Sequence, residues 1–220
     1  MQARLVDIPE NEVLLYLGYR GQSIDQKLEN QIRACIQRVM QTSQPRLVYR
    51  IMDVKDAQIE GLELEGSDLR DLLLTCDKAV VMAATLGSLA EDTLRKAEVT
   101  NMADAVIMDS AQSAAIENVC NCFEEDLQKE LGQDHYLTDR FSPGYGDLPL
   151  QSQRQLMAAV DATRRIGLTL TPTDLMVPRK SVTCIIGISD KPQKRRKRGC
   201  ETCSMFRTCA YRKEGRNCNG

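Results

Sequence analysis

Residues 140–149, which read R-F-S-P-G-Y-G-D-L-P, combine residue types that can build a ligand site. Arg140 presents a planar fork of N–H donors that can bind a carboxylate or phosphate through two parallel hydrogen bonds. Gly144 lacks the side chain that would keep a ligand away from the backbone, and Tyr145 adds an aromatic ring and a hydroxyl group. The alternative is an ordinary turn between two helices, and residue types alone do not separate the two interpretations.

A second segment sharpens the interpretation. Residues 168–178 read L-T-L-T-P-T-D-L-M-V-P and precede an apolar segment at 181–188. The order R-x-x-x-G-Y, then L-T-x-x-x-x-M-x-P, then S-V-x-x-x-x-G resembles the activation (reactivation) domain of cobalamin-dependent methionine synthase. The chain is similar to that domain over residues 105–189, and we expect it to be a free-standing version, because it has no room for cobalamin, folate or homocysteine modules.

The resemblance implies a site for S-adenosylmethionine (AdoMet) in the first segment. In this hypothesis Arg140 holds the carboxylate of AdoMet, and the backbones of Ser142 and Gly144 bind its amino and adenosine ends. Tyr145 orders the loop beside the sulfonium. No catalytic acid or base is expected, because a sulfonium methyl group is already electrophilic and the protein contributes its position.

Glu117 is the acidic residue that the resemblance implies for the amino-acid or sulfonium end of AdoMet. It belongs to the pattern Asp109-x3-Ser113-x3-Glu117. Because four residues make about one helical turn, these three side chains are expected on one face of a helix. The family also uses an acidic residue near its N-terminus, and the opening of this chain assigns it no position.

The function implied is that of an accessory subunit in methionine biosynthesis. It would bind AdoMet and support the reductive methylation of cob(II)alamin, with the cobalamin held by a cobalamin-binding methionine synthase or a related corrinoid protein. A flavodoxin- or ferredoxin-like protein would donate the electron. We expect a part of a methyltransferase that is not active alone; the alternative is a non-catalytic AdoMet sensor or a metal-dependent scaffold for a corrinoid methyltransferase.

Four of the nine cysteines cluster near the end of the chain, as Cys200-x2-Cys203-x5-Cys209-x8-Cys218. In a reducing cytoplasm such a cluster favours metal binding over disulfides. Four thiolates complete either a zinc site or an iron-sulfur cluster, and the spacing does not choose between them. Free or redox-active thiols are the alternative. If the cluster is iron-sulfur, this tail could deliver the electron itself. The remaining cysteines lie in apolar sequence and are predicted to be buried: Cys35, Cys76, Cys120, Cys122 and Cys184.

Charge divides the chain into two parts. From Lys191 onward there are ten Lys or Arg residues and two Glu, which gives +8, whereas the rest carries 19 basic and 29 acidic residues, which gives -10. We therefore expect an AdoMet-binding domain at 1–190 and a basic linker with a four-cysteine tail at 191–220. We expect the basic run at 194–198 to be a linker that also steers docking onto an acidic partner or a phosphate-bearing ligand, and the alternative is a solvated linker alone. A nucleic-acid-binding zinc protein is disfavoured, because no aromatic residue interleaves the run.

Composition indicates a folded protein of the cytoplasm. Hydrophobic residues make up 42% and charged residues 27%, which is ordinary for a globular protein. No apolar stretch is long enough to cross a bilayer, and no signal peptide opens the chain, so a membrane is not an expected partner. Nucleic acid is not an expected partner either. His135 is the only histidine, which excludes a multi-histidine metal site.

The sequence pattern predicts a mixed α/β fold with a mainly antiparallel sheet flanked by long helices. A continuous apolar run at 79–86 is expected to form a buried central strand. The helix at 23–41 is expected to be capped by Ser23, and a short helix at 68–74 by Asp68. Further helices are predicted from Ser88 and at 102–131 and 151–166, and further strands at 47–54, 59–64 and 181–189.

Overall fold

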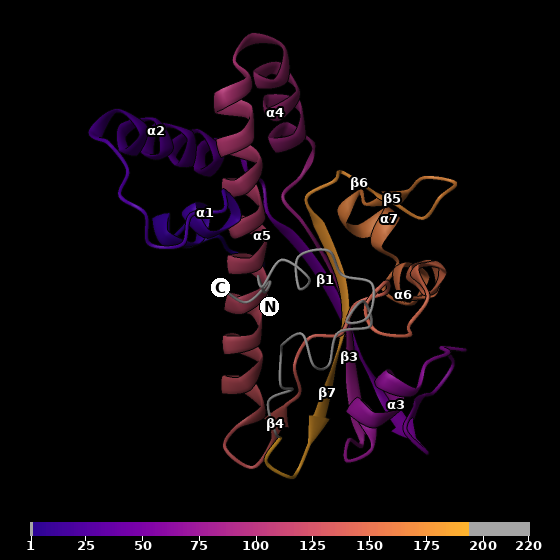
Figure 1. The fold of residues 1–220 in the computed structure, drawn as a ribbon. Coiled ribbons are helices and arrows are strands. Elements are labelled where there is room, and N and C mark those ends of the chain that lie inside the picture. The colour runs from indigo at the N-terminus through magenta and orange to yellow at the C-terminus, as the bar shows by residue number, and fades with distance from the viewer. Residues whose placement is uncertain (1, 194–220) are drawn as a thin grey trace, which may run out of the picture.

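The computed structural model describes residues 2–193, which form a five-stranded sheet with helices on both faces (Figure 1). The strand order is β2-β1-β3-β7-β4, and every neighbouring pair is antiparallel. Two short strands, β5 and β6, form a separate antiparallel pair. The strands are β1 (Arg46–Lys55), β2 (Gln58–Ile59), β3 (Lys78–Thr85), β4 (Tyr136–Leu137), β5 (Thr169–Leu170), β6 (Met176–Val177) and β7 (Ser181–Ser189).

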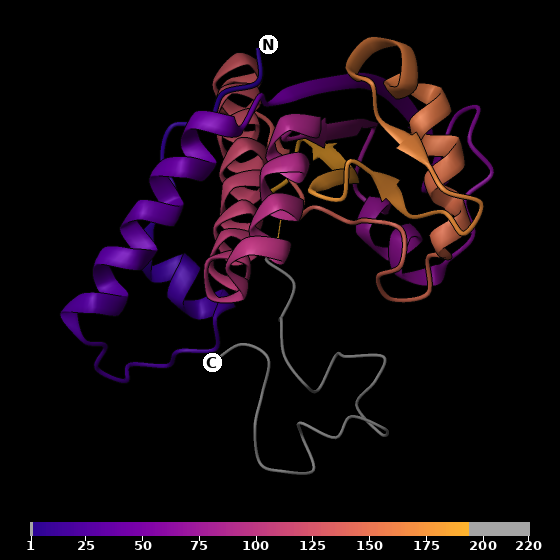
Figure 2. The same cartoon turned by 90° about the horizontal axis from the view of Figure 1, so that it is seen from above.

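The helices form layers on the two faces of this sheet (Figure 2). On one face α4 and α5 cover the strands, with α1 and α2 packed outside α5; α3, α6 and α7 lie on the other face. This arrangement confirms the predicted mixed α/β class with a mainly antiparallel sheet. The helices are α1 (Glu10–Tyr16), α2 (Gln26–Thr42), α3 (Ser67–Leu73), α4 (Ser88–Thr100), α5 (Met102–Leu131), α6 (Gln153–Ala159) and α7 (Ala162–Ile166), with a 3-10 turn η1 (Leu150–Ser152) before α6.

The central strand β3 divides the core in two. Val80, Met82 and Ala84 belong to the hydrophobic cluster beneath α4 and α5, whereas Val81 and Ala83 belong to the cluster beneath α6 and α7. Alternation of this kind follows from the period of two in a strand. Because both faces are buried, the strand reads as a continuous apolar run, as the sequence predicted.

Helix α5 has the bounds that the sequence predicted. The side chain of Asn101 accepts hydrogen bonds from the N–H groups of Ala103 and Asp104, at 3.2 and 3.3 Å, which caps its start. Gly132 ends it with a left-handed φ of 83°. The caps at its two ends and its buried, alanine-rich face stabilise this long helix.

Two of the expected helix caps are wrong. Helix α2 begins after Asp25, whose carboxylate accepts a hydrogen bond from Leu28 N–H at 2.7 Å, so Ser23 lies outside the helix. Helix α3 begins at Ser67, and the carboxylate at its start comes from Asp147 in the distant loop, not from Asp68. A cap provided by tertiary contact cannot be read from local sequence.

Two other predicted elements differ from the structure. The predicted strand at 59–64 is reduced to β2, because the chain turns away from β1 after Ile59. The predicted helix at 151–166 is divided into η1, α6 and α7, because Asp161 adopts a left-handed φ of 53°. Helix α1 was not anticipated from the sequence. The other predicted elements, which are β1, β3, β7 and α2 to α5, agree with the structure to within a few residues, whereas the short strands β4, β5 and β6 were not predicted.

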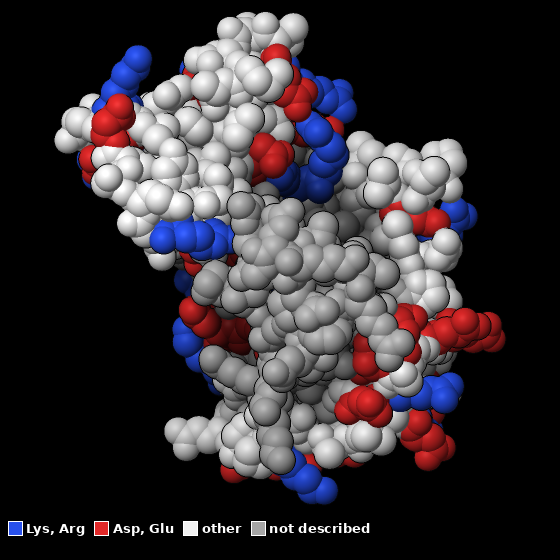
Figure 3. Space-filling view, viewed as in Figure 1, with Lys and Arg blue, Asp and Glu red and all other residues white. Residues whose placement is uncertain are grey.

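Acidic side chains gather beside α3 on the face seen in Figure 3, in keeping with the negative charge calculated for the body of the chain. None of the described helices combines the length and the apolar character that crossing a membrane requires. Cys200, Cys203, Cys209 and Cys218 lie outside the described residues, so the four-cysteine metal site and the boundary at residue 191 stay predictions.

Candidate functional site

Arg140 lies between the sheet and α5 and is bound by three side chains of that helix. Its guanidinium donates to Glu117 Oε2 at 2.7 Å, to Asn121 Oδ1 at 3.0 Å and to Glu124 Oε1. The Arg140 side chain is only 19% exposed, whereas that of Glu117 is 39% exposed. The structure therefore brings together the predicted carboxylate-binding cation and the predicted helix acid, with Glu117 on the solvent side. We call Arg140, Glu117, Asn121 and Glu124 the Arg140 cluster.

The electrostatics of the Arg140 cluster reflect burial and an excess of negative charge. Burial, partly offset by Arg140, raises the pKa of Glu124 above its usual range. Burial acts to lower the pKa of Arg140, but Glu124, Cys120 and Glu117 outweigh it and hold the net pKa above its ordinary value. One cation faces two carboxylates, so the cluster has a formal charge of -1 when both are ionised.

Arg140 is positioned by a short extension of the sheet. Phe141 N–H donates to Ile185 O at 2.9 Å, and Ile185 N–H donates to Phe141 O at 2.8 Å. Two residues later Pro143 has no N–H to donate, so the ladder cannot continue in the same way. The chain leaves β7 at this point, and Arg140 remains fixed beside the strand with its side chain toward α5.

The loop after Arg140 is a tight turn. Tyr145 N–H donates to Ser142 O at 3.1 Å, Pro143 occupies the second position, and Gly144 occupies the third with a φ of 89°. These are the features of a type II turn, in which the third residue needs a left-handed φ that favours glycine. Gly144 N–H donates to Leu148 O at 2.9 Å. The backbone N–H of Gly144 is therefore occupied within the loop.

Asp147 ties this loop to the opposite face of the sheet. Its carboxylate accepts from Ser67 N–H at 2.6 Å, from the Ser67 hydroxyl at 2.7 Å and from Asp68 N–H at 3.1 Å. The hydrogen bonds from the Ser67 hydroxyl and amide lower the pKa of Asp147. The loop is thus held at both ends, by the bridge to β7 and by the start of α3.

The polar face of α5 continues beyond the residues singled out from the sequence. Lys180, just before β7, places Nζ 2.8 Å from Asp109 Oδ1 and 2.8 Å from Ser113 Oγ. Asp109 and Ser113 therefore pair with Lys180, and Glu117 pairs with Arg140 one turn further along. Sequence reasoning missed Asn121 and Glu124, although extending the same helical spacing by two further turns would have found them.

The first helix contributes a further aromatic side chain. Tyr16, the last residue of α1, is 51% exposed and lies on a helix that packs against α5. Burial, followed by the negative charges of Glu117 and Glu12, raises the pKa of its hydroxyl, and Tyr145 and Arg140 also act on it. The sequence carried no signal for this residue, because α1 is short and its partners are distant in the chain.

Two buried thiols, those of Cys120 and Cys184, are subject to the charge of Arg140. Burial raises the pKa of Cys120 to about 12 and holds that of Cys184 well above its usual range, and Arg140 acts on both. Neutral, buried thiols behave as small apolar side chains. All five cysteines of the described residues are buried and free, which confirms the prediction for them. In residues 2–193 no group of three or more His, Cys, Asp or Glu side chains is arranged to hold a metal ion.

The predicted site residues thus fall into two groups. Arg140, Glu117, Ser142, Gly144 and Tyr145 lie together at the junction of α5, β7 and the turn, with Tyr145 68% exposed. The four tail cysteines are not placed by the structure. His135 is exposed on the segment after α5, where its ring nitrogen Nδ1 contacts Leu131 O at 3.1 Å. A catalytic role for it has no support in this arrangement.

Comparison with known proteins supports the fold and indicates a family. A structure titled "Crystal Structure of the MetH Reactivation Domain bound to AdoHcy" is similar with a TM-score of 0.60 at 11% sequence identity, over 97% of this chain and 85% of the other. That similarity shows the fold. No curated protein matches the sequence. The family described as "Vitamin B12 dependent methionine synthase, activation domain" matches residues 88–195, which include every residue of the Arg140 cluster. Residues 88–195 of this chain therefore belong to the vitamin B12 dependent methionine synthase activation domains.

Proposed function

We propose that the Arg140 cluster and the adjoining turn bind AdoMet. The observation that carries the proposal is a largely buried arginine that pairs with two carboxylates, of which Glu117 is the more exposed. The amino-acid end of AdoMet has a carboxylate for Arg140 and an ammonium for Glu117. The sulfonium adds one more positive charge, which offsets the formal -1 of the cluster. The donor set therefore fits the ligand in type and in charge.

The turn supplies the remaining contacts in this proposal. The Gly144 carbonyl and the Ser142 backbone line the ligand, and Tyr145 covers the sulfonium. The rigid turn holds these groups in one arrangement before the ligand arrives, which lowers the entropy cost of binding. Bound AdoMet supplies a methyl group that is electrophilic because it is attached to a sulfonium. The residues of this chain hold that group in position and exclude water from it.

We infer that the client is a cobalamin-dependent methionine synthase or a related corrinoid protein, which holds the cobalamin. The protein would support reductive methylation of cob(II)alamin there, with one electron from a flavodoxin- or ferredoxin-like donor. Family membership of residues 88–195 supports this role. An AdoMet sensor without a catalytic role would bind the same ligand, and rescue of an oxidised methionine synthase in trans separates the two functions.

The test of the site is anaerobic titration of AdoMet into the full chain by calorimetry. Arg140→Ala should weaken binding by about 1.5–3 kcal/mol, the value of a hydrogen bond to a charged group, or roughly tenfold to 150-fold. Arg179→Ala is the matched control, because Arg179 also pairs with two carboxylates but lies outside the Arg140 cluster. Equal affinity in wild type and Arg140→Ala would remove Arg140 from the site.

We propose that the tail is a separate module at 191–220 and that Cys200, Cys203, Cys209 and Cys218 bind zinc or an iron-sulfur cluster. The support is the residue type and number alone. Metal analysis and visible absorption after anaerobic purification test this assignment. A brown protein with iron and sulfide allows the tail to donate the electron. A colourless protein with one zinc per chain makes it a structural or docking element, and a metal-free protein contradicts the proposal.

A further inference from the structure

An open groove lies between the end of α3 and the segment that follows β4, and the last described residues run along it. The groove has a volume of about 440 Å³, and Lys191, Pro192 and Gln193 form part of its wall. The chain is fixed there, because Ser189 Oγ donates to Thr75 O at 2.5 Å and Gln193 Nε2 donates to Thr75 Oγ1 at 3.0 Å. Residue 194 is therefore attached directly to the wall of this groove.

The lining of the groove combines apolar and acidic side chains. Leu72 and Leu74 come from the end of α3 and the residue after it, and Leu74 is 69% exposed. Asp71 of α3 and Asp139, which directly precedes Arg140, add two carboxylates. Within the described residues no ion pair or hydrogen bond engages the Asp71 carboxylate. The groove therefore offers apolar surface next to negative charge.

The charges on the two sides of this junction are opposite. Residues 60–77, which contain α3, carry six acidic side chains and one basic side chain, and acidic groups gather beside α3 in Figure 3. Residues 191–198 carry six basic side chains and no acidic one. Lysine and arginine pack their aliphatic stems on apolar surface and place their charged ends on carboxylates. A lysine- and arginine-rich segment therefore matches this groove in both properties.

The point of attachment favours the chain's own basic run over any other occupant. Exposed ion pairs are individually weak, so a separate peptide of this composition would have little affinity for the groove. A segment joined at Gln193 needs no association step, because its effective concentration at the groove is set by a tether of a few residues. Weak contacts are sufficient for binding in that case.

We propose that the basic run at 194–198 docks into this groove, with its cations on Asp71 and Asp139. The inference does not depend on AdoMet binding. The docked run neutralises acidic groups of its own chain, so it is not free to attract an external acidic partner. Cys200 follows Gln193 by seven residues, which span at most roughly 25 Å. Docking therefore holds the start of the four-cysteine tail close to the segment that carries Arg140.

Cross-linking of the full chain with a carbodiimide tests the occupant, because this reagent joins a lysine amine to a carboxylate without a spacer. At low salt, mass spectrometry should find Lys194 or Lys197 joined to Asp71 or Asp139 within one chain. These cross-links should disappear in about 1 M salt, where the Debye length is about 3 Å. Cross-links of the same lysines to a second chain, or only to carboxylates outside the groove, would overturn the proposal, as would their complete absence.

Limited digestion with trypsin tests the groove, because a docked run is protected from cleavage. Asp71→Asn should accelerate cleavage within 194–198 at low salt by roughly twofold to fivefold, the effect of losing one exposed ion pair. Asp92→Asn is the matched control, because Asp92 is exposed on α4, on the other face of the sheet. Equal rates in wild type and Asp71→Asn, or the same acceleration in both variants, would contradict docking in the groove. The wild-type cross-links decide the matter even where Asp71→Asn does not fold.

Discussion

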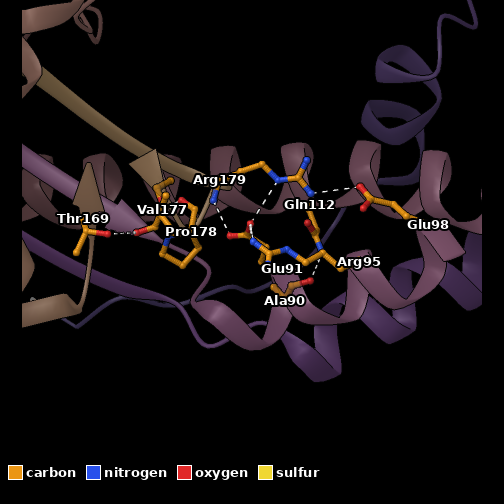
Figure 4. A network of polar contacts seen from close by, with 10 residues as sticks. Ala90, Glu91, Arg95, Glu98, Gln112, Thr169, Val177, Pro178 and Arg179 are labelled. Carbon is orange, nitrogen blue, oxygen red and sulfur yellow. Dashed lines mark hydrogen bonds and ion pairs between the residues drawn. The ribbon is translucent and has the colours of Figure 1, made fainter. Parts of the chain in front are cut away.

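Two clusters of charged residues join α4 and α5 to the segments beside β7, and they differ in which charge is buried. In the Arg140 cluster the buried group is a cation, with carboxylates around it. In the second cluster the buried group is Glu91 of α4, 8% exposed, which pairs with Arg95 at 2.8 Å and accepts from Arg179 N–H at 3.0 Å (Figure 4). Arg179 also donates to Glu98 at 3.3 Å. We call these four residues the Glu91 cluster.

The difference in net charge distinguishes the structural Glu91 cluster from the Arg140 cluster, which we propose binds a ligand. The Glu91 cluster contains two arginines and two glutamates and is neutral, so it needs no further partner. Its cations are exposed, and surface ion pairs of this kind contribute little on their own. The Arg140 cluster carries one uncompensated carboxylate beside an exposed turn. Excess charge beside an exposed turn is costly without a ligand and useful with one, which is why we propose binding for this cluster alone.

The largest expected effect is on stability, from Glu91→Ala. The change leaves the Arg179 N–H without its acceptor and removes the anion that links α4 to the start of β7, so unfolding should become easier by about 2 kcal/mol. For a chain of this length this corresponds to a fall in Tm of about 4–8 °C. Thermal unfolding followed by circular dichroism measures it.

Two controls sharpen this result. Arg95→Ala removes only an exposed partner of Glu91 and should cost less than about 1 kcal/mol. AdoMet affinity should be the same in both variants, since neither contacts the Arg140 cluster. A loss of AdoMet binding in Glu91→Ala at temperatures where it is folded would contradict the division between the two clusters.

The sequence anticipated those parts of the molecule that local pattern determines. Helix α5 has a cap at Asn101, an apolar face and a glycine at its end, and β3 is an apolar run buried on both faces; their bounds agreed with the predictions. Arg140 and Glu117 were both named as site residues, and they form an ion pair. Helical spacing and residue type were sufficient there, because each residue was interpreted within its own segment.

What the sequence did not reveal depends on contacts between distant segments. The carboxylate of Asp147 caps α3 and accepts from Ser67, 80 residues earlier in the sequence. Arg179 N–H donates to Glu91, 88 residues earlier. Helix α1 packs on α5, which lies about a hundred residues further along the chain. The helix predicted at 151–166 is broken at Asp161, which adopts a left-handed backbone conformation. Aspartate tolerates this conformation, but its presence in a sequence does not predict it. None of these contacts leaves a periodic signal.

A second expected effect separates the two carboxylates around Arg140. Glu117→Gln keeps the shape of the side chain but removes the charge proposed to meet the ammonium and sulfonium, so AdoMet affinity should fall by roughly tenfold. Glu124→Gln removes the more buried carboxylate, which competes with the ligand carboxylate for Arg140. Its AdoMet affinity should be unchanged or higher. Calorimetry of the two variants tests this prediction. Equal losses of AdoMet affinity in both variants would show that the two carboxylates contribute only through the net charge of the site.

The smallest expected effect is a dependence of stability on pH that is specific to Glu124. Burial raises its folded pKa above the value of 4.5 for a free glutamate. The folded protein then keeps a proton that the unfolded chain has already released. By linkage, the contribution of Glu124 to stability falls as pH rises from the unfolded to the folded pKa.

Glu124→Gln has no such proton to lose. The difference in Tm between Glu124→Gln and wild type should therefore shift in favour of the variant as the pH rises from the pKa of an unfolded glutamate, about 4.3, through the raised pKa of Glu124. Glu117→Gln provides the comparison at the same guanidinium, because Glu117 is more exposed. A shift of the same size in both variants would mean that the whole cluster titrates as a unit. A shift confined to Glu124 would show that burial, rather than proximity to Arg140, distinguishes the structural carboxylate from the one at the ligand side.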